Sequence, residues 1–254
     1  MNLHYLFIDI KRQLRNVSNT VFIIGIPLLM YLIFGSTQGA SEEMAFHANV
    51  AFYVMVSMAI YGGVSAVVSI TGTAALESMQ GWSRQIGLTP MRNFGYVATK
   101  SIVAMLYSAI VITFIFTMGR LTGAYATSIG VWLTSAVLAW LLSSIFALYG
   151  LAVALNFKSD SAASVATGLI VVLSFFGNLF VPLSGTMLSV ARFTPLYGIA
   201  QLARWPQLEG HVMNVAGGEF GQDSLAFVLL NVFVWSAIFA AFAVLGVRRG
   251  RRRT

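Results

Sequence analysis

The chain has 254 residues, of which 58% are hydrophobic and only 9% are charged, and its formal net charge is +7. Its mean hydropathy is +0.82. Because soluble domains carry about 25% charged residues, this composition excludes a soluble globule and predicts an integral membrane protein. The lack of cysteine excludes disulfides, thiol catalysis and cysteine metal sites.

Six apolar runs reach the roughly 20 residues that a helix needs to cross a bilayer. None contains an acidic or basic residue, and they are 16–36, 49–70, 101–119, 129–155, 162–181 and 225–247. The runs lack the alternation of a membrane β-barrel. The sequence therefore predicts an all-α, polytopic membrane helix bundle, a single transmembrane domain over 1–254. A cleaved signal peptide at the first run is disfavoured by the long, partly amphipathic segment before it.

Residues 1–15 have the pattern of an amphipathic helix. The apolar residues fall at spacings of three and four, on the face opposite most of the charged ones. The apolar set is Leu3, Leu6, Phe7, Ile10 and Leu14, and the charged set is Asp9, Lys11, Arg12 and Arg15. This pattern predicts an interfacial helix in the headgroup plane. It would serve either as an anchor or as a lever that joins a cytoplasmic partner to the first span.

The basic residues predict the orientation of the chain. Twelve of the fifteen lie on the side of the N-terminus, and the others are Arg120, Arg192 and Arg204. The positive-inside rule then places both termini in the cytoplasm. This asymmetry accounts for the net charge, so no nucleic-acid partner is predicted. The C-terminal "RRGRRR" is either a stop-transfer anchor or a contact for anionic lipids.

The loops on the outer side differ in character. Segments 37–48 and 120–128 have the composition of simple connectors. Segment 182–224 is apolar in its first half but is interrupted by Pro182, Gly185 and Pro195. We expect extracellular re-entrant or interfacial helices there, held against the bundle, followed by a polar loop.

The residues predict no catalytic site and no metal site. The three histidines are isolated and lie outside the spans. Ser184 has no base partner in the bundle, so it is interpreted as structural. Without ionisable residues in the spans, proton or sodium coupling is disfavoured. The chain also lacks a P-loop. If it drives transport, a separate ATPase subunit must bind ATP and Mg²⁺, and this chain needs no cofactor.

The predicted cytoplasmic loop 71–100 contains a recognisable motif. A short helix over about 76–88 would end at "TP". Glu77, Gly81 and the pair Thr89-Pro90 resemble the signature "E-R-x-x-G-T-L-x-x-L-x-x-T-P" of ABC transporter permeases of the type-2 exporter class. The stretch "GWSRQIGLTP" is similar to a bacterial, drug-exporter-like subgroup. Ser78 departs from the arginine usual in that signature.

The resemblance covers the whole chain and implies functional residues. It implies a coupling helix that docks into an ABC ATPase subunit, with a second copy or a related permease completing the transporter in the cytoplasmic membrane of a bacterium. The coupling residues would be Glu77, Gly81, Trp82, Arg84, Gln85, Thr89 and Pro90. It also implies a substrate path between the second and fifth spans. The candidates there are Ser57, Tyr61, Ser174, Phe175, Phe176, Asn178 and Phe180.

The second span carries a stripe of small residues, Ala59, Gly62, Gly63 and Ala66, which allows close helix approach. The candidate path has aromatic rings and hydroxyls but no charge. We therefore expect a permease subunit of an ATP-driven exporter, not an enzyme, that moves an amphipathic drug, antibiotic or lipid-like molecule. The alternatives are a polysaccharide or lipid exporter permease, a non-transporting membrane scaffold or sensor and, less favoured, an intramembrane enzyme.

Overall fold

The computed structural model describes residues 3–37, 42–79, 93–157, 162–213 and 221–251. The helices are α1 (Leu3–Arg15), α2 (Val17–Phe34), α4 (Val50–Met79), α6 (Asn93–Leu121), α7 (Ile129–Ser143), α8 (Ile145–Asn156), α9 (Ala162–Phe176), α10 (Gly185–Ala191), α11 (Pro195–Leu208) and α12 (Leu225–Arg251). The short strands are β1 (Met44–Ala45), β2 (Ala48–Asn49), β3 (His211–Val212) and β4 (Gly221–Gln222). The all-α class is confirmed in its coarse form, a membrane helix bundle.

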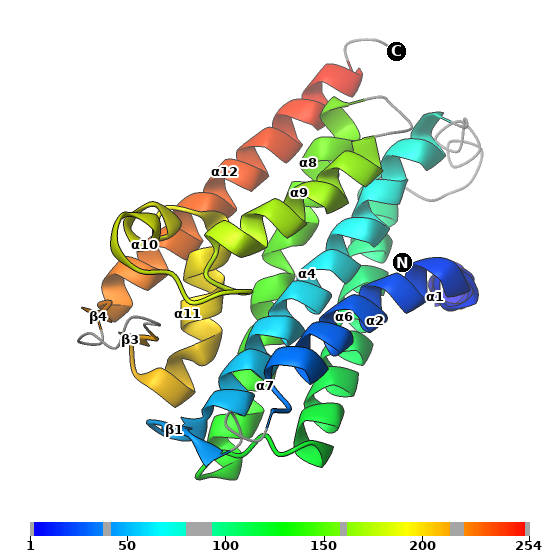
Figure 1. Ribbon diagram of the computed structural model, residues 1–254. Helices are drawn as coiled ribbons and strands as arrows, with labels where there is room; N and C mark the ends of the chain where they lie inside the picture. The colour runs from blue at the N-terminus through cyan, green and yellow to red at the C-terminus, as the bar shows by residue number, and fades with distance from the viewer. Residues whose placement is uncertain (1–2, 38–41, 80–92, 158–161, 214–220, 252–254) are drawn as a thin grey trace.

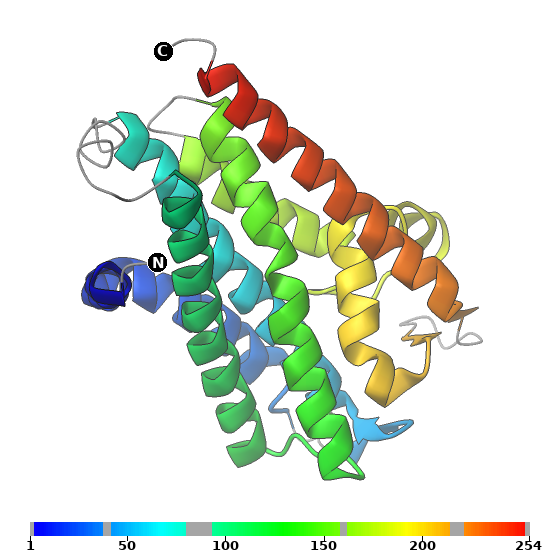
Figure 2. The same ribbon diagram turned by 180° about the vertical axis from the view of Figure 1, so that it is seen from behind.

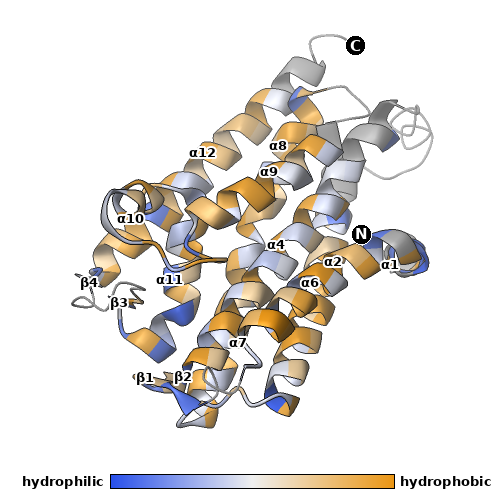
Figure 3. Ribbon diagram, in the orientation of Figure 1, coloured by the Kyte–Doolittle hydropathy of each residue, from blue (hydrophilic) through white to orange (hydrophobic). Residues whose placement is uncertain are grey.

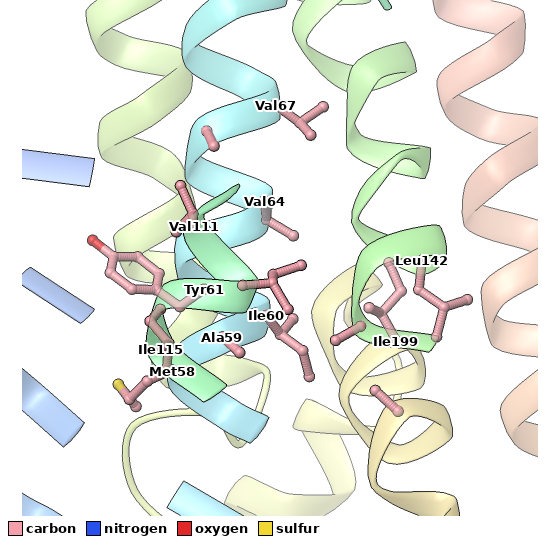
Figure 4. Packing of buried hydrophobic residues seen from close by; sticks show 14 of the residues in the cluster. Met58, Ala59, Ile60, Tyr61, Val64, Val67, Val111, Ile115, Leu142 and Ile199 are labelled. Atoms are coloured by element: carbon pink, nitrogen blue, oxygen red, sulfur yellow. The ribbon is translucent and has the colours of Figure 1, made fainter. Parts of the chain in front are cut away.

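Helix α4 forms the centre of the bundle. It packs against α2, α6, α7, α8, α9 and α11. Its apolar residues are distributed all round the helix, a pattern that suits a helix enclosed by others. Figure 4 shows its side chains among those of neighbouring helices, with Ile60 of α4 near Leu142 of α7 and Ile199 of α11. The hydrophobic core is therefore formed where the surrounding helices pack on α4, the second predicted span.

Four helical stretches are long and apolar enough to cross a membrane, counting only described residues. They are Val50–Thr73, Ala98–Leu121, Ile129–Asn156 and Leu225–Gly246. They coincide with the second, third, fourth and sixth predicted spans. The shorter apolar helices Asn19–Phe34 and Ser164–Phe176 fall within the first and fifth. Figure 3 shows apolar residues along all these helices. A count of six spans stays a prediction for the two shorter helices.

Several boundaries differ from the sequence prediction. Helix α4 continues to Met79 and α6 begins at Asn93, so both ends of the predicted loop 71–100 are helical. Residues 74–77, two alanines, a leucine and a glutamate, are good helix formers and extend α4 beyond its apolar stretch. The fourth span is divided into α7 and α8 at Ser144.

The fifth apolar helix is shorter than the predicted span 162–181. Helix α9 ends at Phe176, and Asn178 takes a left-handed conformation with φ of 58°. Its side-chain Oδ1 accepts a hydrogen bond of 2.7 Å from the backbone N–H of Leu183. This local bond stabilises a turn that competes with continued helix.

The end of the bundle that holds β1 and β2 is called the strand end below (Figure 1). Here the two predicted connectors are joined to each other, since Ala48 pairs with Ala126 as an antiparallel bridge. The Nδ2 of Asn49 donates to the carbonyl of Gly123 at 2.8 Å, and its Oδ1 accepts from the N–H of Phe52 at 3.0 Å. The described parts of these loops are thus bonded to each other, which simple connectors would not be.

Segment 182–224 contains the two helices α10 and α11 and the strand pair β3–β4. Helix α11 is largely buried and packs against α4, α7, α9 and α12. Helices held against the bundle are therefore present where the sequence predicted them. Their re-entry into the membrane stays a prediction.

Candidate functional site

Four charged side chains from three helices meet beside the predicted coupling loop. Lys100 of α6 places its Nζ 2.8 Å from Oε1 of Glu77, near the end of α4, and 3.0 Å from Oδ2 of Asp9 on α1. Arg12 of α1 pairs with the same two acids, with its NH2 2.9 Å from Oδ1 of Asp9. We call Asp9, Arg12, Glu77 and Lys100 the ion cluster.

The ion cluster is largely shielded from water. The side chains of Lys100 and Asp9 are 0% and 3% exposed, and that of Glu77 is 10% exposed, whereas Arg12 is 53% exposed. Among the described residues, two cations of the cluster face two anions. Because an uncompensated buried charge is costly, these helices are held in one arrangement.

Glu77 was predicted to contact a partner protein, and the structure shows its carboxylate directed into the ion cluster. Asp9 was expected on the polar face of the amphipathic helix, and it is buried against α6 instead. The reason is that Lys100, on a neighbouring helix, supplies a counter-charge. The other predicted coupling residues, Gly81, Trp82, Arg84, Gln85, Thr89 and Pro90, lie outside the described residues.

A buried arginine connects α11 to the predicted substrate path. Arg204 is 0% exposed, and its NH1 and NH2 each donate to the carbonyl of Asn178 at 3.0 Å. Its NH2 also donates to Oγ of Ser57 on α4. The guanidinium lies 4.1 Å from the ring centroid of Tyr53, a cation–π contact. No carboxylate among the described residues forms an ion pair with it.

The expectation that this region carries no charge is therefore wrong. Arg204 was counted among the outer basic residues because its segment is far from α4 in sequence, and tertiary packing brings it to Ser57. Among the described residues it is the one basic side chain seated between the second and fifth predicted spans. A lone arginine in an apolar, helix-compatible segment was the available signal for it.

The structure brings together most of the other candidate path residues. The ring of Phe180 contacts those of Tyr61 and Phe175 edge to face, each at a centroid distance of 4.9 Å. Ser174 is buried, but its hydroxyl donates to the carbonyl of Ile170 in its own helix at 2.7 Å. Phe176 is 38% exposed and lies apart from these contacts.

The small-residue stripe of α4 is used within the chain. A Cβ at Gly62 would lie 2.9 Å from Cγ1 of Val111, and one at Gly63 would lie 2.8 Å from Oγ of Ser143. The stripe therefore allows α6 and α7 to approach α4 closely. It does not present a free surface to a second copy of the chain.

A second polar cluster joins described residues of segment 182–224 to one another and to α12. Asp223 accepts a hydrogen bond from the hydroxyl of Tyr197, and its Oδ1 lies 2.9 Å from NH2 of Arg192. The amide Nδ2 of Asn231 on α12 donates to the carbonyl of Arg192 at 2.8 Å. Burial raises the pKa of the Tyr197 hydroxyl, and the hydrogen bond to Asp223 raises it further. Sequence reasoning found none of these partners, because they are set by the folding of the segment onto α12.

The described residues thus form an apolar helix bundle with a buried ion cluster and a polar, aromatic contact between two predicted spans. No protein-family model matches the sequence. The chain is 25% identical over 210 residues to a protein of Bacillus subtilis (strain 168) named "Putative transport permease YvfS", and the match covers 80% of this chain and 83% of that protein. This similarity supports assignment of the chain as a membrane permease.

Proposed function

We propose that this chain is the membrane-spanning subunit of an ATP-driven exporter of the type-2 ABC class. It works with a separate ATPase subunit that binds ATP and Mg²⁺, in the cytoplasmic membrane of a bacterium, with both termini in the cytoplasm. The observation that carries the proposal is the bond between Glu77 and Lys100, which joins the two helices on either side of the predicted coupling loop at 2.8 Å.

The ion cluster suits a device that transmits motion. Glu77 precedes the loop and Lys100 follows it, and Asp9 ties both to α1. A force on the loop would therefore move α1, α4 and α6 as one unit. In this proposal Glu77 positions the helices, and the side chains that dock on the ATPase are those within the loop, such as Arg84 and Gln85.

In the proposed transporter this chain pairs with a second copy or a related permease. The pairing uses faces other than the buried stripe of α4. Helices α2 and α9, the first and fifth predicted spans, each expose apolar side chains. Val21, Phe22 and Leu29 of α2 are 59%, 63% and 58% exposed. Val165 and Val172 of α9 are 62% and 50% exposed. Such outward apolar faces suit contact with a second copy or a related permease as well as with lipid.

The proposed cargo is an amphipathic small molecule such as a drug, an antibiotic or a lipid-like compound. The aromatic contacts of Tyr61, Phe175 and Phe180 would bind its apolar part. Passage between α4 and α9 requires the bonds from Arg204 to Ser57 and Asn178 to open. Nucleotide binding to the ATPase would bias this two-state change.

The test is purification of the tagged chain from its native membrane, followed by identification of the proteins recovered with it and measurement of ATP hydrolysis. We expect a stoichiometric ATPase with the unchanged chain and its loss with the double variant Arg84→Ala, Gln85→Ala. Glu77→Gln should retain the ATPase but uncouple hydrolysis from cargo. Glu43→Gln, an exposed acid at the strand end, is the matched control and should change neither property.

Recovery of the folded chain without any nucleotide-binding protein, in several mild detergents, would overturn the exporter proposal. The scaffold or sensor function would then be favoured. If the ATPase is present but is stimulated only by a polysaccharide or a lipid, the exporter class stands and the cargo assignment fails.

A further inference from the structure

A groove of about 500 Å³ runs between α6 and α7, the third and fourth predicted spans, on the surface of the bundle. Figure 2 shows these two green helices side by side. The groove is formed almost wholly by apolar side chains, among them Ile112, Phe116 and Leu133. Its walls belong to two stretches that are long and apolar enough to cross a membrane, Ala98–Leu121 and Ile129–Asn156. Its open, mostly apolar lining suits contact with hydrocarbon.

Two polar side chains of the inner groove, those of Thr117 and Trp140, are already bonded within the protein. The hydroxyl of Thr117 donates to the carbonyl of Thr113 at 2.8 Å. The indole N–H of Trp140 donates to the carbonyl of Met105 at 2.9 Å. These two groups thus require no polar partner from a ligand, and the rest of the lining is mostly apolar, which suits an alkyl chain. From Ala109 to Arg120 the wall of α6 extends about 16 Å at 1.5 Å per residue, a length comparable to most of a fatty-acyl chain.

One end of the groove is different, because it carries a cation. Arg120 lines the groove in the last turn of α6, at the strand end, and no ion pair or hydrogen bond joins its side chain to another described residue. Trp132, in the first turns of α7, lines the same end and packs against Phe52 at a ring-centroid distance of 5.1 Å. Arginine and tryptophan at a span end are typical of the headgroup level of a membrane.

We propose that this groove is a binding site for one anionic phospholipid, with an acyl chain along α6 and α7 and the headgroup phosphate on Arg120. The charge of Arg120 selects an anionic over a zwitterionic headgroup, and the apolar walls hold the chain. The site is separate from the candidate substrate path, which lies between α4 and α9. This inference does not depend on the proposed exporter function.

The test uses lipids that quench tryptophan fluorescence. The full chain is placed in bilayers that contain brominated phosphatidylglycerol or brominated phosphatidylcholine. The signal is the fluorescence quenching of the unchanged chain minus that of the double variant Trp132→Phe, Trp140→Phe. This difference reports on the two groove tryptophans alone. We expect about a fivefold preference for phosphatidylglycerol, the contribution of one basic residue near an anionic headgroup.

Different variants test the headgroup contact and the acyl-chain contact. Arg120→Gln should bring the preference close to one, while Lys11→Gln, an exposed basic residue on α1, should leave it unchanged. Ala136→Phe fills the groove and should reduce quenching by both lipids. Ala109→Leu serves the same purpose if the first substitution prevents folding, as judged by circular dichroism.

An unchanged preference in Arg120→Gln would overturn the headgroup assignment. Unchanged quenching in both groove-filling variants would show that no acyl chain occupies the groove. Absence of quenching by either lipid in the unchanged chain would also overturn the proposal, since it would mean that protein covers this face.

Discussion

Lys100 and Glu77 are separated by 23 positions and by the predicted coupling loop, yet their side chains meet at 2.8 Å in an almost fully buried position. The ammonium of Lys100 is also within 3.0 Å of Asp9. One cation thus serves two acids from two other helices. The ends of α1, α4 and α6 are therefore fixed relative to one another by charge rather than by apolar packing alone.

Replacement of Lys100 by methionine should strongly destabilise the chain. It leaves Asp9 and Glu77 with too little compensating charge, and loss of one partner in a buried pair costs about 3–5 kcal/mol. Because the residues form one network, adding Glu77→Gln should recover part of the loss. Thermal unfolding of the purified protein in detergent measures both effects.

Arg12→Gln is the control for the stability loss in Lys100→Met, because it removes the exposed cation of the same cluster. The Arg12 side chain is 53% exposed, so solvent screens its pairing, and the expected loss is below about 1 kcal/mol. Equal losses for Arg12→Gln and Lys100→Met would contradict the buried character of the ion cluster.

Arg204→Lys should destabilise the chain although the charge is kept. An ammonium cannot reproduce the planar fork that bonds Asn178 and Ser57 together. Loss of hydrogen bonds from a charged donor is expected to cost about 1–3 kcal/mol in thermal unfolding. Arg120→Lys, the same substitution at an exposed residue that bonds no side chain in the described part of the chain, should have no measurable effect. A neutral result for Arg204→Lys would refute its role in holding α11 on α4.

Gly63→Ala should destabilise the bundle because the added methyl group would lie 2.8 Å from Oγ of Ser143 and 2.9 Å from Cδ1 of Ile112. Overpacking of this kind costs about 1–3 kcal/mol. Gly168→Ala in α9 meets nothing within 4 Å, and it should stabilise its helix by up to about 1 kcal/mol. Melting temperatures of the two variants should therefore move in opposite directions, and a shift of the same sign would argue against the close contact.

The stability of segment 182–224 should depend on pH through Tyr197. The folded state raises the pKa of this hydroxyl above the value of about 10 in an unfolded chain. Its contribution to stability is therefore complete below about pH 10 and is lost as the pH rises further. The Tm of the unchanged chain should fall more steeply above about pH 10 than that of Tyr197→Phe.

Tyr125→Phe, at a residue that is 50% exposed on the strand end, is the matched control and should keep the steep fall. If Tyr197→Phe shows the same pH dependence as the unchanged chain, then ionisation of Tyr197 does not contribute to the stability of the segment.

The helices could be predicted from sequence more reliably than the contacts between them. A hydrophobic run is a local property, so four of the predicted spans recur as long apolar helices and two as shorter ones. The end of α9 was missed because the turn at Asn178 depends on a side-chain bond to Leu183. Of the candidate path residues, Ser57 and Asn178 are linked through Arg204, and Tyr61 contacts Phe180. Their role as a substrate path stays a prediction.

The sequence by itself determined that the protein is an apolar, cysteine-free bundle of membrane helices, because the cost of placing polar backbone or charge in lipid acts on each segment separately. Only the tertiary structure decided which charges became partners. Asp9 and Lys100 are 91 positions apart, and Ser57 and Arg204 are 147 apart. Burial removes water from both groups of such a pair, and the bond between them offsets that cost. Which groups are buried together depends on how the whole bundle packs.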